Sequence, residues 1–515
     1  MRYDVIITGA GSAGCTLATR LSEDPSRSVL LLEAGPDYPE FDRLPDDLKR
    51  GNNFLRSAFG PHNWGYVAAV TSQQSDPIPI PRGKVVGGSS AINGQILFRG
   101  LPEDYDDWTA LGNDEWAFTK VLPYFRKLET DADFRGDFHG SDGPIPVRRY
   151  KREDMLPHAQ AFYEACLTEG FPDSPDLNHP EATGVGPAPV NNRGGVRVST
   201  ALAYLDQARH RLNLTIRANV TARRILFDSG RAVGVEVESG EERLTVEGDQ
   251  IVLSAGGIAS PQLLMLSGIG PAEHLRSLGI DVIRDLPGVG QNLRDHPMAL
   301  ILFRETGQMP GDLEAMLQVL LRYTVEGSNT RDDMQIATAS IDTEYLPANG
   351  PIARNDNCFT IFVSVQNALS AGELRLTSRD PHVQPSVDYR YLSDSWDVER
   401  MRKAVRLAIR LSEHPAFKGI IIERVSPTDT DLASDAALDS WLLKNVATQF
   451  HSSGTCKMGP ASDPMAVVDQ FCHVYGLERL RVVDTSVMPD VIRANPNATT
   501  IMIAERVADW IKEGR

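Results

Sequence analysis

The sequence predicts an α/β fold, in which a Rossmann-like, dinucleotide-binding domain is joined to a second, α+β domain built on an antiparallel sheet. A GxGxxG pattern follows an apolar run at residues 5–7 and opens an amphipathic helix from Cys15. A second apolar run, at residues 29–32, ends in Glu33. Residues 297–392 hold alternating strands without a glycine fingerprint, which is typical of an antiparallel sheet.

The three glycines of the opening pattern have separate physical roles. Gly9 allows a tight turn, Gly11 lets the backbone approach a pyrophosphate, and Gly14 lets the helix pack close to the strand. The N–H groups at the start of that helix then face the phosphates. Glu33 comes 24 residues after Gly9 (33 − 9), near the spacing of about 20 for the acid that binds ribose hydroxyls. A carboxylate there disfavours a ligand with a 2′-phosphate.

Composition and charge exclude several classes of protein. The chain has 515 residues, of which 41% are hydrophobic and 23% charged, so we expect about two to four packed domains rather than disorder. A net charge of −17 disfavours binding to nucleic acid or to an anionic membrane. No apolar run approaches the roughly 18 residues of a membrane span, and no signal peptide precedes the first strand, so a cytoplasmic protein is expected. The five cysteines are scattered without a CxxC pair, which predicts neither disulfides nor a metal site.

Further elements follow from periodicity and turn residues. Residues 83–94 are rich in glycine and serine, and the backbone N–H groups of such a loop can surround an anion or a planar ring. Helices are expected at 102–127, 155–169, 260–267, 394–413, 429–434, 436–446 and 499–512, and one at 312–324 interrupts the second sheet. Strands are expected at 213–216, 220–227, 233–237, 244–246, 249–253, 298–304, 334–341, 358–366, 373–377, 385–389 and 480–484.

These motifs together resemble those of the glucose–methanol–choline (GMC) oxidoreductases, and the resemblance runs the whole length of the chain. The glycine pattern with Glu33 is the first of them. The others are GKVVGGSSAIN at 83–93, GGIASP at 256–261 with LSGIG at 266–270, GVGQNLRDHP at 288–297, HSSGTCKMG at 451–459 and NPN at 495–497. The resemblance implies an FAD-dependent enzyme that acts on CH–OH groups.

The resemblance also implies which residues hold FAD. Family members with covalent flavin carry a histidine just before the asparagine of the second motif, whereas this chain has Ile92, so non-covalent FAD is expected. Asp484 is one of the residues implied to bind FAD, and its alternative role is a helix cap. The implied FAD-binding residues are Gly9, Gly11, Ser12, Ala13, Gly14, Glu33, Ala34, Gly87, Ser89, Ser90, Asn93, Gly94, Val220, Asp484 and Asn497.

Alcohol oxidation removes a hydroxyl proton and a carbon-bound hydride, so the site needs a base near the flavin. A neutral imidazole is suited to that role near neutral pH. The resemblance makes His451 the base and Asn497 the second catalytic residue, whose amide would orient the substrate oxygen. His296 is interpreted as structural or flavin-adjacent.

Candidate substrate-binding residues lie on the strand predicted at 358–366. Phe362, Ser364 and Gln366 share one of its faces, and Gln449 is a further candidate wall; the alternatives are a core or a solvent-facing position. No acidic cluster marks a cationic substrate, so an uncharged primary alcohol is expected. Gln449 and Ser452 stand where the family more often has an apolar residue and a proline, which leaves the substrate class open.

Ligand-type motifs at both ends imply that the chain returns to its first domain. We expect the FAD-binding domain to comprise residues 1–150, 201–296 and 446–515, and the substrate domain residues 151–200 and 297–445. The predicted reaction converts a primary alcohol to the aldehyde, with oxygen or another acceptor reoxidising the flavin. The alternatives are a hydroxynitrile lyase, a light-driven fatty-acid decarboxylase or a non-catalytic flavin protein; the retained His451 and Asn497 favour oxidation.

Overall fold

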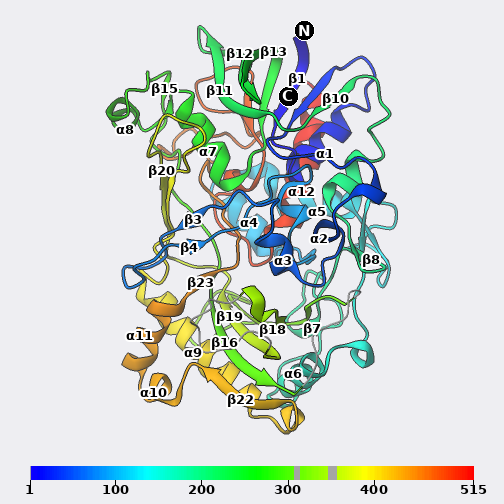
Figure 1. The fold of residues 1–515 in the computed structure, drawn as a ribbon, viewed down its shortest axis with the longest axis vertical. Coiled ribbons are helices and arrows are strands. Elements are labelled where there is room, and N and C mark those ends of the chain that lie inside the picture. Colours follow the sequence, from blue (N-terminus) through cyan, green and yellow to red (C-terminus); the bar gives the residue numbers. More distant parts are fainter. Residues whose placement is uncertain (1, 307–313, 346–355) are drawn as a thin grey trace.

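Two seven-stranded sheets lie at opposite ends of the long axis of the molecule (Figure 1). The computed structural model describes residues 2–306, 314–345 and 356–515. The first sheet has the strand order β10-β2-β1-β13-β12-β11, with β24 beside β13, and lies at the top of Figure 1 near both termini. The second has the order β22-β16-β19-β18-β17-β7, with β23 beside β16.

Parallel strands form the centre of the first sheet. They are β1 (Arg2–Thr8), β2 (Val29–Leu32), β10 (Leu214–Arg217), the second half of β13 (Glu242–Leu253) and β24 (Leu480–Val482). Antiparallel β12 (Arg231–Ser239) and β11 (Thr221–Asp228) extend the sheet along the first half of β13. The strands predicted at 244–246 and 249–253 are therefore one strand, because β13 runs on while its partner changes from β12 to β1.

Helix α1 (Ser12–Leu21) starts directly after Gly11, so the predicted strand–glycine turn–helix unit is present. All four residues of β2 are buried, as expected of a central parallel strand. Helix α12 (Pro496–Lys512) packs against α1, and Arg20 of α1 forms a 2.8 Å ion pair with the buried Glu505 of α12. This contact brings the end of the chain to the opening glycine motif.

The second sheet is antiparallel throughout and is covered on one face by helices. Its strands are β7 (Gly184–Pro187), β16 (Pro297–Glu305), β17 (Leu317–Tyr323), β18 (Met334–Ile341), β19 (Cys358–Val365), β22 (Ile421–Ser426) and β23 (Ala447–Thr448). Helices α6 (Pro157–Thr168) and α9 (Ser395–Ser412) pack on it (Figure 1). The predicted fold class, a Rossmann-like domain with an antiparallel second sheet, is confirmed.

The helix predicted at 312–324 is wrong wherever the structure describes it. Residues 317–323 form the strand β17, and residues 312–313 lie outside the described residues. Every residue from Gln318 to Tyr323 is buried. Met316, Leu317 and Leu320 have the spacing of one helix face, and for so short a stretch periodicity alone does not separate a buried helix from a buried strand.

Other boundaries differ in smaller ways. The helix predicted at 102–127 is divided into α4 (Pro102–Ala110) and α5 (Phe118–Leu128), because Gly112 turns the chain with a φ of 95°. Helix α7 (Gly256–Leu266) begins earlier than expected.

None of the described helices is long and apolar enough to cross a membrane. The remaining elements are α2 (Asp46–Lys49), α3 (Phe54–Ala58), α8 (Ala272–Ser277), α10 (Asp429–Leu432), α11 (Asp435–Asn445), β3 (Val67–Ala68), β4 (Ile78–Pro79), β5 (Glu129–Asp131), β6 (Ile145–Val147), β8 (Asn192–Arg193), β9 (Val196–Arg197), β14 (Ile269–Gly270), β15 (Arg284–Asp285), β20 (Glu373–Arg375) and β21 (Ser386–Asp388).

Candidate active site

A cavity of about 580 Å³ is bordered both by the glycine motifs of the first sheet and by the face of the second sheet that α6 and α9 leave open. Its volume lies within the usual range for ligand pockets, about 300–1,000 Å³. The sequence-predicted residues that border it are Gly9, Gly11, Ser12, Ala13, Glu33, Ala34, Ser89, Asn93, Gly94, Val220, Phe362, Gln449, His451, Asp484 and Asn497. One cavity therefore holds the nucleotide motif and the proposed base.

The three glycines of the opening motif have different surroundings. A Cβ on Gly14 would lie 1.9 Å from the Gly9 carbonyl oxygen, and a Cβ on Gly9, where φ is 97°, would lie 2.5 Å from that of Ser254. These two glycines allow backbone segments to touch. A Cβ on Gly11 would meet only the Cα of Gly88, at 3.9 Å, and would otherwise extend into open space. Gly11 is therefore the position at which a ligand can approach the backbone.

Glu33 is buried at the end of β2 and is fixed by backbone donors. Its Oε2 accepts a hydrogen bond from Ala10 N–H and its Oε1 one from Gly35 N–H, both at 2.9 Å. The N–H of Val220 in turn donates to the Glu33 carbonyl oxygen, at 2.8 Å. Burial raises the pKa of Glu33 to about 7, against the opposing effect of these N–H groups. The carboxylate keeps unused lone pairs on its cavity side, where a diol can donate to them.

The glycine-rich loop folds over the start of α1. Its residues 88–91 form a short 3-10 helix, and a Cβ on Gly88 would lie 2.6 Å from the Cα of Gly11. Ser89, Asn93 and Gly94 border the cavity. Three of the predicted cofactor residues do not. Gly14 packs against β1, Gly87 turns the chain with a φ of 104°, and the Ser90 hydroxyl contacts the Thr200 hydroxyl at 2.9 Å.

Asp484 caps a turn, as its alternative interpretation predicts, and it also borders the cavity. Its Oδ1 accepts from Ser486 N–H at the start of a 3-10 turn, at 2.8 Å. Its Oδ2 accepts from Gly256 N–H at 2.8 Å and from the Ser260 hydroxyl at 2.5 Å. Burial raises the pKa of Asp484. The carboxylate joins β24 to the start of α7 at the cavity wall.

His451 lies beside a second histidine, His296. Their Nδ1 atoms are 2.7 Å apart, and their rings are almost perpendicular, at 85°. The other ring nitrogen of His296, Nε2, lies 2.8 Å from the carbonyl oxygen of Ile492. Both backbone N–H groups, of His296 and His451, donate to Oδ1 of the buried Asp295, at 2.7 and 2.8 Å. One carboxylate therefore positions the two histidines from segments 155 residues apart.

The hydrogen bonds assign a tautomer to each ring. The Ile492 carbonyl can only accept, so His296 must donate from Nε2, and the Nδ1 of a neutral His296 is then an acceptor. His451 must therefore donate from Nδ1, which leaves a lone pair on its Nε2. Burial lowers the pKa of both histidines, and His296 and Arg82 lower that of His451 further. His451 is thus a neutral imidazole with its basic nitrogen free of a proton.

The polar neighbour of that nitrogen is Asn495, which the sequence prediction did not name. Nδ2 of Asn495 lies 3.2 Å from Nε2 of His451, and Oδ1 of Asn495 is buried without a hydrogen-bond partner among the described residues. Asn497, predicted as the second catalytic residue, instead accepts from the Ser12 hydroxyl at 2.7 Å. The structure therefore brings Asn495, rather than Asn497, to the base, and places Asn497 beside the opening motif.

Two of the four predicted substrate residues border the cavity. Phe362 on β19 and Gln449 form part of its wall. Ser364 and Gln366 lie behind Gln449: the amide nitrogen of Gln449 donates to the Ser364 hydroxyl at 2.9 Å, and that of Gln366 donates to the same oxygen at 2.7 Å. Sequence alternation alone did not predict Met298, Leu300 and Gln335 in this wall, because the cross-strand neighbours of β19 were unknown.

The residues present fit FAD. The cavity combines an open glycine turn at Gly11, a helix start, a buried carboxylate at Glu33 for ribose hydroxyls, and a neutral histidine at the other end. These are the groups that a dinucleotide with a redox-active ring requires. Ile92, at the position that would carry a covalent link, borders the cavity with an aliphatic side chain.

Comparison with known proteins gives the same family. Two models described as GMC oxidoreductase match residues 3–298 and 368–504. The chain is 36% identical to an oxygen-dependent choline dehydrogenase of Photobacterium profundum (99% of this chain, 93% of the relative) and 40% identical to one of Klebsiella pneumoniae (99% and 96%). The crystal structure of pyridoxine 4-oxidase from Mesorbium loti superposes with a TM-score of 0.91 at 29% identity and 99% coverage of both chains.

The chain belongs to the GMC oxidoreductase family. It is an enzyme of the class that acts on CH–OH groups, and the family implies FAD as its cofactor. The resemblance read from the sequence is thereby confirmed.

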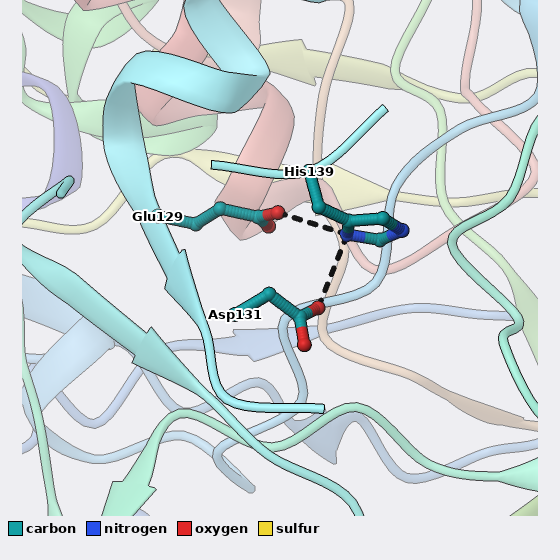
Figure 2. A group of neighbouring side chains, drawn as sticks. All are labelled: Glu129, Asp131 and His139. Atoms are coloured by element: carbon teal, nitrogen blue, oxygen red, sulfur yellow. Dashed lines mark hydrogen bonds and ion pairs between the residues drawn. The ribbon is translucent and has the colours of Figure 1, made fainter. Parts of the chain in front are cut away.

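A second cluster of ionisable side chains lies outside the cavity (Figure 2). Glu129, Asp131 and His139 have the spacing of a possible metal site. Arginines already occupy these carboxylates: Arg99 pairs with Glu129 at 2.5 Å, and Arg149 with Asp131 at 2.9 Å. A further carboxylate, that of Asp176, accepts from His139 Nε2 and from Arg149 Nη2, both at 2.8 Å. With His139 protonated, three buried carboxylates face three cations, and the partly exposed Asp133 lies 3.6 Å from Arg149 at the edge of this ion-pair network.

The protein is expected to become less stable in alkali, because His139 loses its proton there. Burial lowers the pKa of His139, but hydrogen bonds to Asp131, Asp176 and Glu129 outweigh it and raise the pKa to about 10 from an ordinary 6.5. A raised pKa contributes stability that is complete below pH 6.5 and is lost as the pH rises toward about 10. His139→Gln is expected to cost about 3 kcal/mol at neutral pH, since it leaves three buried carboxylates with only two arginines to balance their charge.

The measurement is the thermal unfolding midpoint between neutral pH and about pH 10, for the wild type and His139→Gln. The wild-type midpoint should fall toward that of the variant. The matched control, His382→Gln, removes a histidine that is 51% exposed and should follow the wild-type curve. Parallel curves for wild type and His139→Gln would contradict a protonated His139.

Proposed function

We propose that the enzyme oxidises a primary alcohol to the aldehyde, and that Nε2 of His451 takes the hydroxyl proton. The proposal rests on the two hydrogen bonds that connect the Ile492 carbonyl to His296 and His296 to His451. They fix the tautomer of His451, so that its Nε2 carries no proton and can accept one from a substrate in the cavity. FAD, when bound, would accept the hydride at flavin N5 and pass the electrons to oxygen or another acceptor. Relatives named choline dehydrogenase and pyridoxine 4-oxidase support alcohol oxidation.

Asn495 takes the place of Asn497 as the proposed second residue. Its amide nitrogen lies 3.2 Å from His451 Nε2, which has one lone pair; when the substrate O–H takes that lone pair, the amide hydrogens would donate to the substrate oxygen instead. A donor at that position stabilises the negative charge that develops on the oxygen as its proton leaves. Asn497 remains a proposed cofactor-binding residue through its contact with Ser12.

Anaerobic mixing of the FAD-loaded protein with a panel of primary alcohols tests the proposal. Bleaching of the visible flavin absorbance by an alcohol supports it, and the speed of recovery in air separates an oxidase from a dehydrogenase. A flavin that no alcohol bleaches, but that is bleached by dithionite, would contradict it. The cyanohydrin-cleaving and photodecarboxylating alternatives would then be assayed on the same preparation.

FAD is proposed to be bound without a covalent link, since the aliphatic side chain of Ile92 has no nucleophile. Acid precipitation is expected to leave all of the yellow colour in the supernatant. Colour retained in the washed precipitate would identify a covalent link elsewhere in the cavity. The Ile92→His variant is the informative comparison, because it restores the residue that covalent members carry.

His296 is proposed to be a positioning residue that acts through His451. His296→Leu removes the acceptor of the His451 Nδ1–H, so the ring can adopt the tautomer in which Nε2 carries the proton. The rate of flavin reduction is expected to fall by about 10- to 100-fold, the loss that is typical when the partner of a metal-binding histidine is removed. The same change removes a group that lowers the pKa of His451, so the acid limb of the pH profile should move to higher pH. A slower rate with an unmoved acid limb would indicate only a structural role.

A further inference from the structure

The cavity face of the second sheet carries its glutamine side chain, Gln335, at the end next to the histidines. Strand β16 begins directly after His296, and its Met298 is paired with Ser364 of β19, which is paired with Gln335 of β18. The next row on the same face is Leu300, Phe362 and Ala337. Because side chains alternate along a strand, both rows face the cavity side. The wall therefore offers polar groups beside the base and an apolar surface beyond.

Gln335 carries the clearest sign of a ligand at this polar end. The residue is 4% exposed and borders the cavity, and none of the described residues forms a hydrogen bond with its amide. An amide that the protein leaves unpaired at a cavity wall can be paired by a ligand, and a ligand group that pairs with it gains affinity. Gln449 lies in the same wall, and Ser364 and Gln366 hold its amide in position.

Both glutamines are uncharged, and the charged groups of the wall lie elsewhere. The carboxylates that border the cavity are, among the described residues, those of Glu33 and Asp484. Each accepts backbone N–H bonds at the nucleotide motifs. A cationic substrate head group would therefore meet amides rather than a carboxylate at the polar end.

We infer that the alcohol oxidised at His451 is an uncharged molecule with an apolar body and a second hydrogen-bonding atom close to its carbinol carbon, and that Gln335 and Gln449 bind this atom. The inference rests on the proposed function and names its substrate class. An amide both donates and accepts, so it suits a ring nitrogen, a ring oxygen or a hydroxyl. The apolar body would lie along Leu300 and Phe362.

The test uses two isomeric alcohols and choline on the FAD-loaded enzyme. In ortho-pyridinemethanol the ring nitrogen is next to the carbinol group, whereas in para-pyridinemethanol it points away, although both rings are electron-poor. Anaerobic flavin reduction should be at least about tenfold faster with the ortho isomer at limiting concentration, because the para isomer leaves the amides unpaired. Choline should be the slowest of the three.

Substitutions test whether the amides of Gln335 and Gln449, rather than the rest of the cavity wall, cause the preference for the ortho isomer. Gln335→Leu and Gln449→Leu should bring the ortho-to-para ratio toward one. Gln335→Glu keeps the size and polarity of the side chain but cannot donate to a ring nitrogen; it should lower the same ratio and raise the rate with choline. The control is Thr360→Val, two rows away on the same face, whose hydroxyl is already bound to the Ile301 carbonyl at 3.1 Å. It should keep the wild-type ratio, and flavin content verifies that each variant is folded.

Reduction at equal rates by the two isomers, fastest reduction by choline, or a ratio unchanged in all three glutamine variants would overturn the inference and leave alcohol oxidation standing. If none of the three alcohols, nor any of the wider panel, reduces the flavin, the proposed function itself fails and the inference with it.

Discussion

His451→Gln is expected to slow anaerobic reduction of the flavin by an alcohol by about three orders of magnitude. The variant removes the proton acceptor at the cavity, and a positioned general base typically contributes about 10²- to 10⁴-fold. Glutamine keeps a polar side chain of similar length next to Asn495, so the cavity should retain its shape. The measurement is the rate of loss of flavin absorbance after rapid mixing, with FAD content determined first.

Ser453→Ala is the matched control for this change. Ser453 is two residues further along, fully buried, and its hydroxyl has no hydrogen-bond partner among the described residues. It should reduce its flavin at nearly the wild-type rate. A His451→Gln variant that also reduces its flavin at nearly the wild-type rate would show that another group takes the proton.

Gly11→Val is expected to give a folded protein that has lost most of its FAD. The φ of Gly11 is −84°, which valine adopts, and an added Cβ meets no protein atom closer than 3.9 Å. The side chain would instead occupy cavity space at the start of α1, where the backbone receives the pyrophosphate. Overpacking there costs about 1–3 kcal/mol, which weakens FAD binding about 10- to 100-fold.

Gly14→Ala provides the contrast. Its Cβ would lie 1.9 Å from the Gly9 carbonyl oxygen, so this variant should lower the unfolding midpoint of the FAD-free protein. Gly11→Val should leave that midpoint unchanged and lower only the ratio of visible flavin to protein absorbance. A Gly11→Val protein with full flavin content would show that the pyrophosphate does not approach this turn.

The first βαβ unit was predictable because local signals agree. An apolar run, three spaced glycines and a second run ending in Glu33 lie within 33 residues, and each signal favours the same structure. Strand β17 was not predictable in this way. Met316, Leu317 and Leu320 have the spacing of one helix face, and this pattern competes with the partial alternation of the strand.

The candidate site shows a similar limit. The sequence contains both asparagines of the NPN run, but which of them reaches His451 depends on where α12 begins. The helix starts at Pro496, so Asn495 precedes it and faces the base, whereas Asn497 lies in its first turn beside Ser12. The role of His296 depends on a contact across 155 residues, which no local pattern predicts.

Alcohol oxidation at His451 is tested most directly by anaerobic flavin reduction with a primary alcohol and with the same alcohol carrying deuterium on its carbinol carbon. Both alcohols should bleach the bound flavin of the wild-type enzyme, and the deuterated one should do so more slowly, because the bond to that hydrogen breaks as the hydride leaves while His451 takes the hydroxyl proton. A flavin that neither alcohol bleaches, although dithionite reduces it, would contradict alcohol oxidation at this site.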